Sequence, residues 1–138
     1  MNTFFIRIAA VLGAISVATG AFAAHTLKSI VTPEVLQIFE TAVKYQFYHV
    51  IALLATGILF KEYAGKKLQW AGWLFIAGIV LFCGSLYLLC LLKHLYPADR
   101  FWVGAITPVG GICFIAGWLL MAMGIGKKST LQVTNIGV

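Results

Sequence analysis

The sequence predicts an all-α membrane protein, a bundle of four transmembrane helices joined by short loops. Of the 138 residues, 62% are hydrophobic and 10% are charged, whereas soluble domains have roughly 45–50% apolar and about 25% charged residues. Four apolar stretches contain no Asp, Glu, Lys, Arg or His, and they are residues 8–24, 50–60, 68–92 and 101–126. A spanning helix needs roughly 17–25 mainly apolar residues. Three stretches meet this length, and the second does so once residues 42–49 are included.

We expect a single four-helix domain over residues 1–128. Its helices are predicted at residues 4–25, 33–61, 68–92 and 102–126, followed by a loose polar tail at 129–138. Near the N-terminus, Arg7, an apolar run and Ala21-Phe22-Ala23 are also typical of a signal peptide with a small-residue cleavage site. We interpret this segment as a first helix that is retained.

The residues indicate where two of the helices begin. Thr32-Pro33-Glu34 provides a capping side chain, a proline for the first turn and an acid near the positive end of the helix dipole. A helix over 33–61 exceeds the hydrocarbon thickness, so its first three turns are expected at or above the interface. The last helix begins either near Phe101 with a kink at Pro108, or at Pro108 with Thr107 as its cap. Gly110-Gly111 favours the cap, because glycines weaken a helix interior.

Small residues recur at regular intervals and predict close helix packing. The interval is four residues in the first helix and seven residues in the third and fourth helices. The three stripes are Ser16, Gly20 and Ala24; Ala71, Gly78 and Ser85; and Gly110, Gly117 and Gly124. Such stripes let helix backbones approach closely in lipid. We expect them to pack helices within the bundle or between protomers.

The net charge is +6, from ten Lys and Arg against four acids. These cations flank the apolar runs, where lipid headgroups supply the anions, so we expect membrane lipids as partners and no nucleic acid. One side of the predicted bundle carries six cations and the other carries four. The six are Arg7, Lys61, Lys66, Lys67, Lys127 and Lys128, and the four are Lys28, Lys44, Lys93 and Arg100. The excess of cations on cytoplasmic loops then places both termini in the cytoplasm.

A polar segment interrupts the apolar pattern of the second helix. Glu40 and Lys44 are four residues apart, as are Tyr45 and His49, so each pair shares a helix face. Together with residues that end or begin other helices, they predict a polar cluster inside the bundle near its outer end. Its members are His25, Glu40, Lys44, Tyr45, Tyr48, His49 and Thr107. The alternative is an interfacial anchor, with tyrosines among the headgroups and the Lys44 ammonium extended toward water.

The sequence contains no recognisable catalytic set. It has no Gly-rich phosphate loop, and its three cysteines lie inside apolar runs without a CxxC pair. His25, His49 and His94 stand on separate helices without a local ligand spacing, which is weak support for haem or a metal. We therefore expect no catalytic residue, no metal or other cofactor, and no disulfide. With no ionisable residue in the middle of a predicted helix, a proton antiporter is also disfavoured.

Four motifs, taken in order, resemble a known family. They are Gly20-Ala21-Phe22-Ala23-Ala24-His25, Phe39-x-Thr41-Ala42-Val43-Lys44-Tyr45-Gln46-x-Tyr48-His49, Gly84-Ser85-Leu86-Tyr87 and Gly104-Ala105-Ile106-Thr107-Pro108-Val109-Gly110-Gly111. Over nearly the whole chain, as far as Trp118, they are similar to the YgdD-like family of small bacterial inner-membrane proteins, a domain of unknown function with transmembrane relatives in animals. Ala23 departs from the family, where glycine is expected. The resemblance implies four spans, a retained first helix and the inner (plasma) membrane, and it implies no particular activity.

These observations favour a non-enzymatic membrane protein that packs against itself, as a homo-oligomer, or against a larger membrane complex. Its role would be that of a scaffold, an accessory subunit or an envelope-maintenance protein. The alternative is an oligomeric transporter or channel for a small or lipid-like solute. Water-filled access lined by Tyr45, Tyr48 and Thr107 would favour the transporter, and a dry, packed bundle would favour the scaffold.

The orientation can be tested by labelling single cysteines with a membrane-impermeant reagent. Because of the cation bias, a cysteine replacing Gly65 should be protected in intact cells, and one replacing Ala98 should be labelled. Labelling of position 65 without labelling of position 98 would reverse the assignment.

Overall fold

A computed structural model describes residues 1–96 and 102–126 of the chain. The first two spans are α1 (Thr3–His25), with the short 3₁₀ turn η1 (Leu27–Ser29) after it, and α2 (Pro33–Leu59). The third span runs without a break through α3 (Lys66–Gly78), the π-helical turn η2 (Ile79–Cys83) and α4 (Gly84–Leu95), and the fourth consists of η3 (Trp102–Ala105) and α5 (Thr107–Gly124). All four are long and apolar enough to cross a membrane, and the described residues contain no strand. This confirms the predicted fold class; the predicted tail at 129–138 lies outside the described residues.

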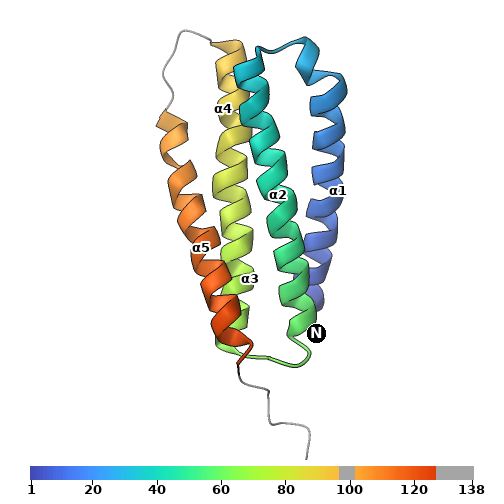
Figure 1. Cartoon of the computed structure of the whole chain (residues 1–138), viewed down its shortest axis with the longest axis vertical. Helices are drawn as coiled ribbons and strands as arrows, with labels where there is room; N and C mark the ends of the chain where they lie inside the picture. The colour runs from blue at the N-terminus through green and yellow to red at the C-terminus, as the bar shows by residue number, and fades with distance from the viewer. Residues whose placement is uncertain (97–101, 127–138) are drawn as a thin grey trace, which may run out of the picture.

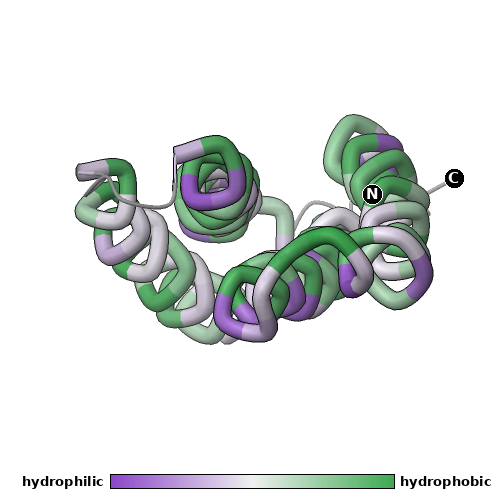
Figure 2. The backbone as a smooth tube through the Cα atoms, turned by 90° about the horizontal axis from the view of Figure 1, so that it is seen from above, coloured by the Kyte–Doolittle hydropathy of each residue, from purple (hydrophilic) through white to green (hydrophobic). Residues whose placement is uncertain are grey.

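The four spans run up and down (Figure 1). The N-terminus, the turn between α2 and α3 and the end of α5 lie at the lower end of the bundle in this view, and the α1–α2 connection and the end of α4 lie at the upper end. α2 and the third span are central; α1 packs on α2, and α5 packs on the third span. Figure 2, which looks along the bundle, shows α1 and α5 on opposite sides and hydrophobic colour along every span.

The buried face of α1 follows a seven-residue interval. Its buried residues are Phe5, Ala9, Ser16 and Ala23. Gly20 lies beside this row, where an added Cβ would be 3.5 Å from Val43 of α2, but Ala24 is exposed. A step of seven residues stays close to one helix face, whereas two steps of four drift away from it. The packing stripe predicted at intervals of four is therefore corrected at Ala24, whose place is taken by Ala23.

The third span and α5 fit together through glycines that face large side chains. The glycines and their neighbours are Gly110 with Phe82, Gly117 with Phe75, Gly124 with Leu68, and Gly78 with Phe114. Leu68, Phe75 and Phe82 rise by sevens along the third span, while the glycines opposite them descend by sevens along α5. Gly78 of one predicted stripe and the three glycines of the other therefore lie at this antiparallel interface, where each glycine makes room for an aromatic or aliphatic residue of the other helix.

The structure shows how α2 and α5 begin. Thr32 caps α2 as predicted, because its hydroxyl accepts a hydrogen bond from the Val35 N–H (3.4 Å). The predicted Thr107 cap of the last helix needs correction: α5 begins at Thr107 itself, the cap residue is Ile106, and Pro108 lies in the first turn. The Thr107 hydroxyl is bonded to Ser85 of α4 instead (2.8 Å), so that side chain joins two helices rather than capping one.

The π-helical turn η2 was not predicted. It widens the third span at Ile79–Cys83, where the Gly84 N–H reaches back to the Ile79 carbonyl. Gly110 of α5 presses against the backbone of Phe82 in the same turn. Single π turns of this kind often mark functional positions, and this one ends two residues before Ser85.

Replacing Gly117 by alanine should destabilise the bundle. The new Cβ would lie 2.9 Å from Cε1 of Phe75, a ring with no exposed surface. Overpacking of this kind costs about 1–3 kcal/mol, measurable by detergent-induced unfolding followed by circular dichroism. Gly84→Ala is the matched control, since nothing lies within 4 Å of its added Cβ and the change should stabilise a helix by roughly 0.5–1 kcal/mol. Equal effects of the two substitutions would contradict this description of the interface.

Candidate functional site

The polar segment of α2 lies half-way along the bundle. Glu34, near the start of α2, forms an ion pair with Lys93 near the end of α4 (3.0 Å), so α2 begins level with the end of the third span. Gln46 is then the middle residue of α2 (Pro33–Leu59), and its side chain reaches Leu12, half-way along α1. The prediction that the polar cluster lies near the outer end of the bundle is therefore wrong, because α2 does not project above the neighbouring helices.

Gln46 joins three spans. Its side chain is 3% exposed, its Nε2 donates to the Leu12 carbonyl of α1 (3.2 Å), and its Oε1 accepts from the Tyr87 hydroxyl of α4 (2.9 Å). The amide thus has partners on both sides, which offsets the cost of bringing it into the membrane. Hydrogen bonds between helices in a membrane are worth on average about 0.6 kcal/mol and at most about 1.7 kcal/mol. Gln46 and Tyr87 therefore hold α1, α2 and α4 in one arrangement.

Ser85 and Thr107 form a second link, between α4 and α5. The two hydroxyl oxygens are 2.8 Å apart, and the Ser85 hydroxyl also reaches the Phe82 carbonyl (2.9 Å). Because a carbonyl can only accept, Ser85 donates its one proton to Phe82 and accepts the proton of Thr107. Both hydroxyls are thereby engaged in structure, and among the described residues neither is hydrogen-bonded to a general base that would make it a nucleophile.

His49 is buried between aromatic rings. Its side chain is 6% exposed, and its ring stacks on Phe114 of α5 (centroids 3.4 Å apart, planes 9° apart) with Tyr45 on another side (6.1 Å, 15°). Nδ1 lies 2.7 Å from the Tyr45 carbonyl, so Nδ1 carries the proton and Nε2 is left as an acceptor. The prediction that no ionisable residue lies in the middle of a helix is wrong for α2, where His49 stands three residues past the midpoint.

The predicted seven-residue cluster is not assembled in the interior. Within the described residues, His49 is buried and Thr107 half-buried, whereas the other members are exposed; these are His25, Glu40, Lys44, Tyr45 and Tyr48. Residues two apart lie about 200° apart around a helix of 3.6 residues per turn. With Gln46 facing the interior, Lys44 and Tyr48 must face outward, and Glu40 shares their face.

Sequence reasoning overlooked Gln46 and Tyr87 as the centre of the interior polar contacts. The signal was present, because apolar residues lie at helical spacing on both sides of Gln46, with Ala42 before it and Val50 and Leu53 after it, and all three are buried. A helical-face comparison would have separated Gln46 from the charged residues beside it.

The three histidines and the three cysteines differ in their surroundings. Residues 1–96 and 102–126 contain no group of three or more His, Cys, Asp or Glu placed to hold a metal ion. His25 and His94 are exposed and His49 is enclosed by aromatic rings. The three cysteines are free thiols, with Cys83 and Cys90 buried and Cys113 half-buried.

Four apolar spanning helices with a packed, hydrogen-bonded interior define a multi-pass integral membrane protein. The chain belongs to the family described as "Protein of unknown function (DUF423)", which matches residues 19–111, a range that contains all four motifs noted above. A UPF0382 membrane protein of Staphylococcus saprophyticus is 42% identical over 123 residues, covering 89% of this chain and 97% of the relative. The UPF0382 membrane protein YwdK of Bacillus subtilis is 37% identical over 124 residues, covering 89% and 96%. No solved structure matches the chain.

The Gln46–Tyr87 contact can be measured with a double-mutant cycle. Gln46→Leu and Tyr87→Phe should each lower the free energy of unfolding, and the double variant should lose less than their sum, with a coupling of about 0.6–1.7 kcal/mol. Tyr96→Phe is the control, because Tyr96 is exposed at the end of α4 and should show no coupling to Gln46→Leu. Additive losses for Gln46 and Tyr87 would show that the contact does not form.

Proposed function

We propose that this protein is a non-enzymatic structural or accessory component of the bacterial inner (plasma) membrane that acts by lateral assembly, with itself or within a larger complex. The observation that carries the proposal is an ionisable pair, Glu40 and Lys44, on the exposed face of α2 (Pro33–Leu59). Within the described residues, neither side chain makes an ion pair. The resemblance to YgdD-like inner-membrane proteins supports the location, and the cation bias supports cytoplasmic termini.

Placing Glu40 and Lys44 at this depth in the membrane costs free energy in a monomer. Lys44 follows Glu34, which lies at the upper end, by ten residues or about 15 Å of helix. α2 is about 40 Å long, compared with a hydrocarbon thickness of about 30 Å. Lys44 therefore starts well inside the hydrocarbon, where a lysine at full depth costs about 2.5–3.5 kcal/mol on insertion scales. Extension of the side chain toward water recovers part of this cost, and a partner helix would recover more.

A second copy of the chain fits this face. One acid and one base lie four residues apart on the same side of α2, with Tyr48 one turn further along. In a twofold dimer with parallel α2 helices, Glu40 of each protomer can pair with Lys44 of the other, because such an interface is self-complementary. Intramembrane ionisable residues usually face a partner or a polar cavity.

The packed interior supports assembly over solute passage. The interior of the lower half of the bundle is filled by Leu53, Thr56 and Phe75, none of which has exposed surface. Tyr45 and Tyr48, two of the residues that would line an access route, are exposed on the outside of α2, and Thr107 is bonded to Ser85. The alternative function is an oligomeric transporter or channel for a small or lipid-like solute. The polar residues at mid-depth favour it. However, Gln46 is already hydrogen-bonded within the bundle, and His49 is stacked on Phe114.

Charge exchange provides a sharp test of the assembly. In lipid nanodiscs or mild detergent, the wild-type chain should show a dimer mass by native mass spectrometry. Glu40→Lys or Lys44→Glu alone should reduce the dimer by roughly tenfold or more, because it places like charges opposite each other. The double exchange Glu40→Lys with Lys44→Glu should restore the dimer.

Glu62→Lys is the matched control, since Glu62 is exposed in the turn at the lower end. A monomer that purifies alone would overturn the proposal. Co-purification with a different membrane protein, lost in the single exchanges, would support the larger complex instead of the second copy.

A further inference from the structure

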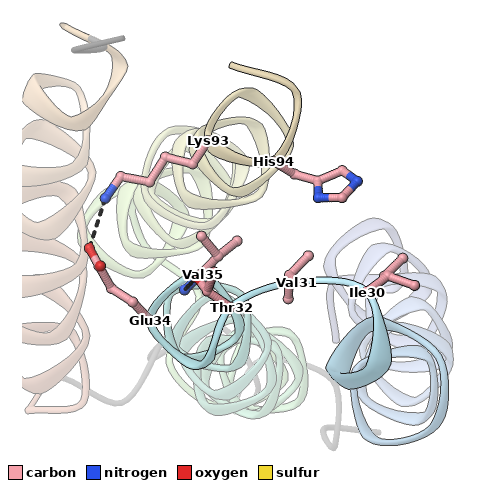
Figure 3. Close-up of a pocket in the computed structure, with 7 residues that line it drawn as sticks. All are labelled: Ile30, Val31, Thr32, Glu34, Val35, Lys93 and His94. Carbon is pink, nitrogen blue, oxygen red and sulfur yellow. Dashed lines mark hydrogen bonds and ion pairs between the residues drawn. The ribbon is translucent and has the colours of Figure 1, made fainter. Parts of the chain in front are cut away.

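A pocket with both apolar and charged walls opens at the upper end of the bundle. It has a volume of about 270 Å³ and lies between the start of α2 and the end of α4. Its lining residues are Ile30, Val31, Thr32, Glu34, Val35, Lys93 and His94 (Figure 3). None of these residues takes part in the interior hydrogen bonds of Gln46 or in the exposed Glu40–Lys44 face.

The bottom and the rim of the pocket differ in character. Beneath it, Leu27, Val35 and Cys90 form a small buried apolar cluster, to which Val31 adds an apolar wall. The polar groups of Thr32, Glu34, Lys93 and His94 stand around the opening. In Figure 3, Lys93 extends toward Glu34 on one side, and His94 points away from it on the other. Such a pocket, at the end of a membrane-spanning bundle, is suited to an amphipathic ligand whose polar part remains near water.

The charges at the rim comprise one cation, one anion and an imidazole. Lys93 Nζ and Glu34 Oε1 are 3.0 Å apart, and the two side chains are 34% and 76% exposed. An ion pair this exposed contributes little stability, so its two partners are available to a ligand that brings both charges. The first turn of α2 adds the N–H of Glu34, since Pro33 has none and the Val35 N–H is bonded to the Thr32 hydroxyl. It also adds the positive end of a 27-residue helix dipole.

We propose that this pocket binds the headgroup of a phospholipid that carries a primary ammonium group. Lys93 holds the phosphate, assisted by the start of α2, because charged and N–H donors bind phosphate oxygens strongly. Glu34 accepts hydrogen bonds from the ammonium. The upper parts of the acyl chains lie against Ile30 and Val31. A trimethylated ammonium has no N–H to donate, and a glycerol headgroup has no positive charge, so both fit Glu34 less well.

Native mass spectrometry of the full chain can compare three lipids that share acyl chains: phosphatidylethanolamine, phosphatidylcholine and phosphatidylglycerol. Phosphatidylethanolamine should bind roughly tenfold more tightly than the other two, the size expected for one charge-assisted hydrogen bond. Glu34→Gln should remove this preference while retaining binding of the phosphate. Lys93→Gln should weaken all three lipids by a similar factor.

Two exposed residues outside the pocket provide matched controls: Lys28→Gln removes a cation at the same end, and Glu62→Gln removes an acid at the other end. Both should bind lipid as the wild type does. Equal affinity of the wild type for the three lipids, or a Glu34→Gln variant indistinguishable from Glu62→Gln, would overturn the proposal. Soluble phosphoethanolamine should compete only weakly; if it bound as tightly as the lipid, the ligand would be a free phosphate ester and the lipid assignment would be wrong.

Discussion

The contact between the glycines of α5 and the large side chains of the third span determines how the rest of the bundle is arranged. Because Gly110 and Gly117 lack side chains, α5 approaches the backbone of Phe82 and the ring of Phe75. The same approach brings Phe114 into the space beside Gly78 and onto the face of His49, and Thr107 within reach of Ser85. In lipid, the hydrophobic effect does not drive helices together. The free energy of helix association must therefore come from close packing and from these few hydrogen bonds.

The polar residues of α2 lie in two different environments, one on its inner face and one on its outer face. On its inner face, Gln46 and His49 are buried; the Gln46 amide bonds to a carbonyl and a hydroxyl, and His49 bonds through Nδ1 to a carbonyl and stacks on Phe114. On its outer face, Glu40 and Lys44 are exposed. An inner polar group that is already paired stabilises one arrangement of helices and offers little to a ligand. An outer charge without a partner remains costly in lipid until something covers it. This contrast favours the outer face of α2, rather than the interior, as the surface through which the protein acts.

Much of the fold could be predicted because it depends on composition and spacing. The spans follow from their apolar length, the start of α2 from Thr32 and Pro33, and the positions of Gly110, Gly117 and Gly124 from a regular interval. The depth of the polar segment could not be predicted, because it depends on how η1 (Leu27–Ser29) returns the chain to a level set by Glu34 and Lys93. The spacing of four residues correctly predicted that Glu40 and Lys44 share a face of α2. It did not predict that this face points out of the bundle. The direction that a helix face points is a tertiary property, decided here by Leu12 and Tyr87 on other helices.

The two surfaces proposed for binding are separate, although α2 contributes to both. Glu34 lies at the start of α2 and is directed to Lys93, whereas Glu40 and Lys44 lie further along and face away from the third span. A lipid held at the upper end would therefore leave the exposed α2 face open, and a second copy on that face would leave the pocket accessible. Lipid bound beside η1 would also help to hold the start of α2 at its level. Because that level sets the depth of Lys44, a lipid at the upper end would also influence a partner on the outer face through α2.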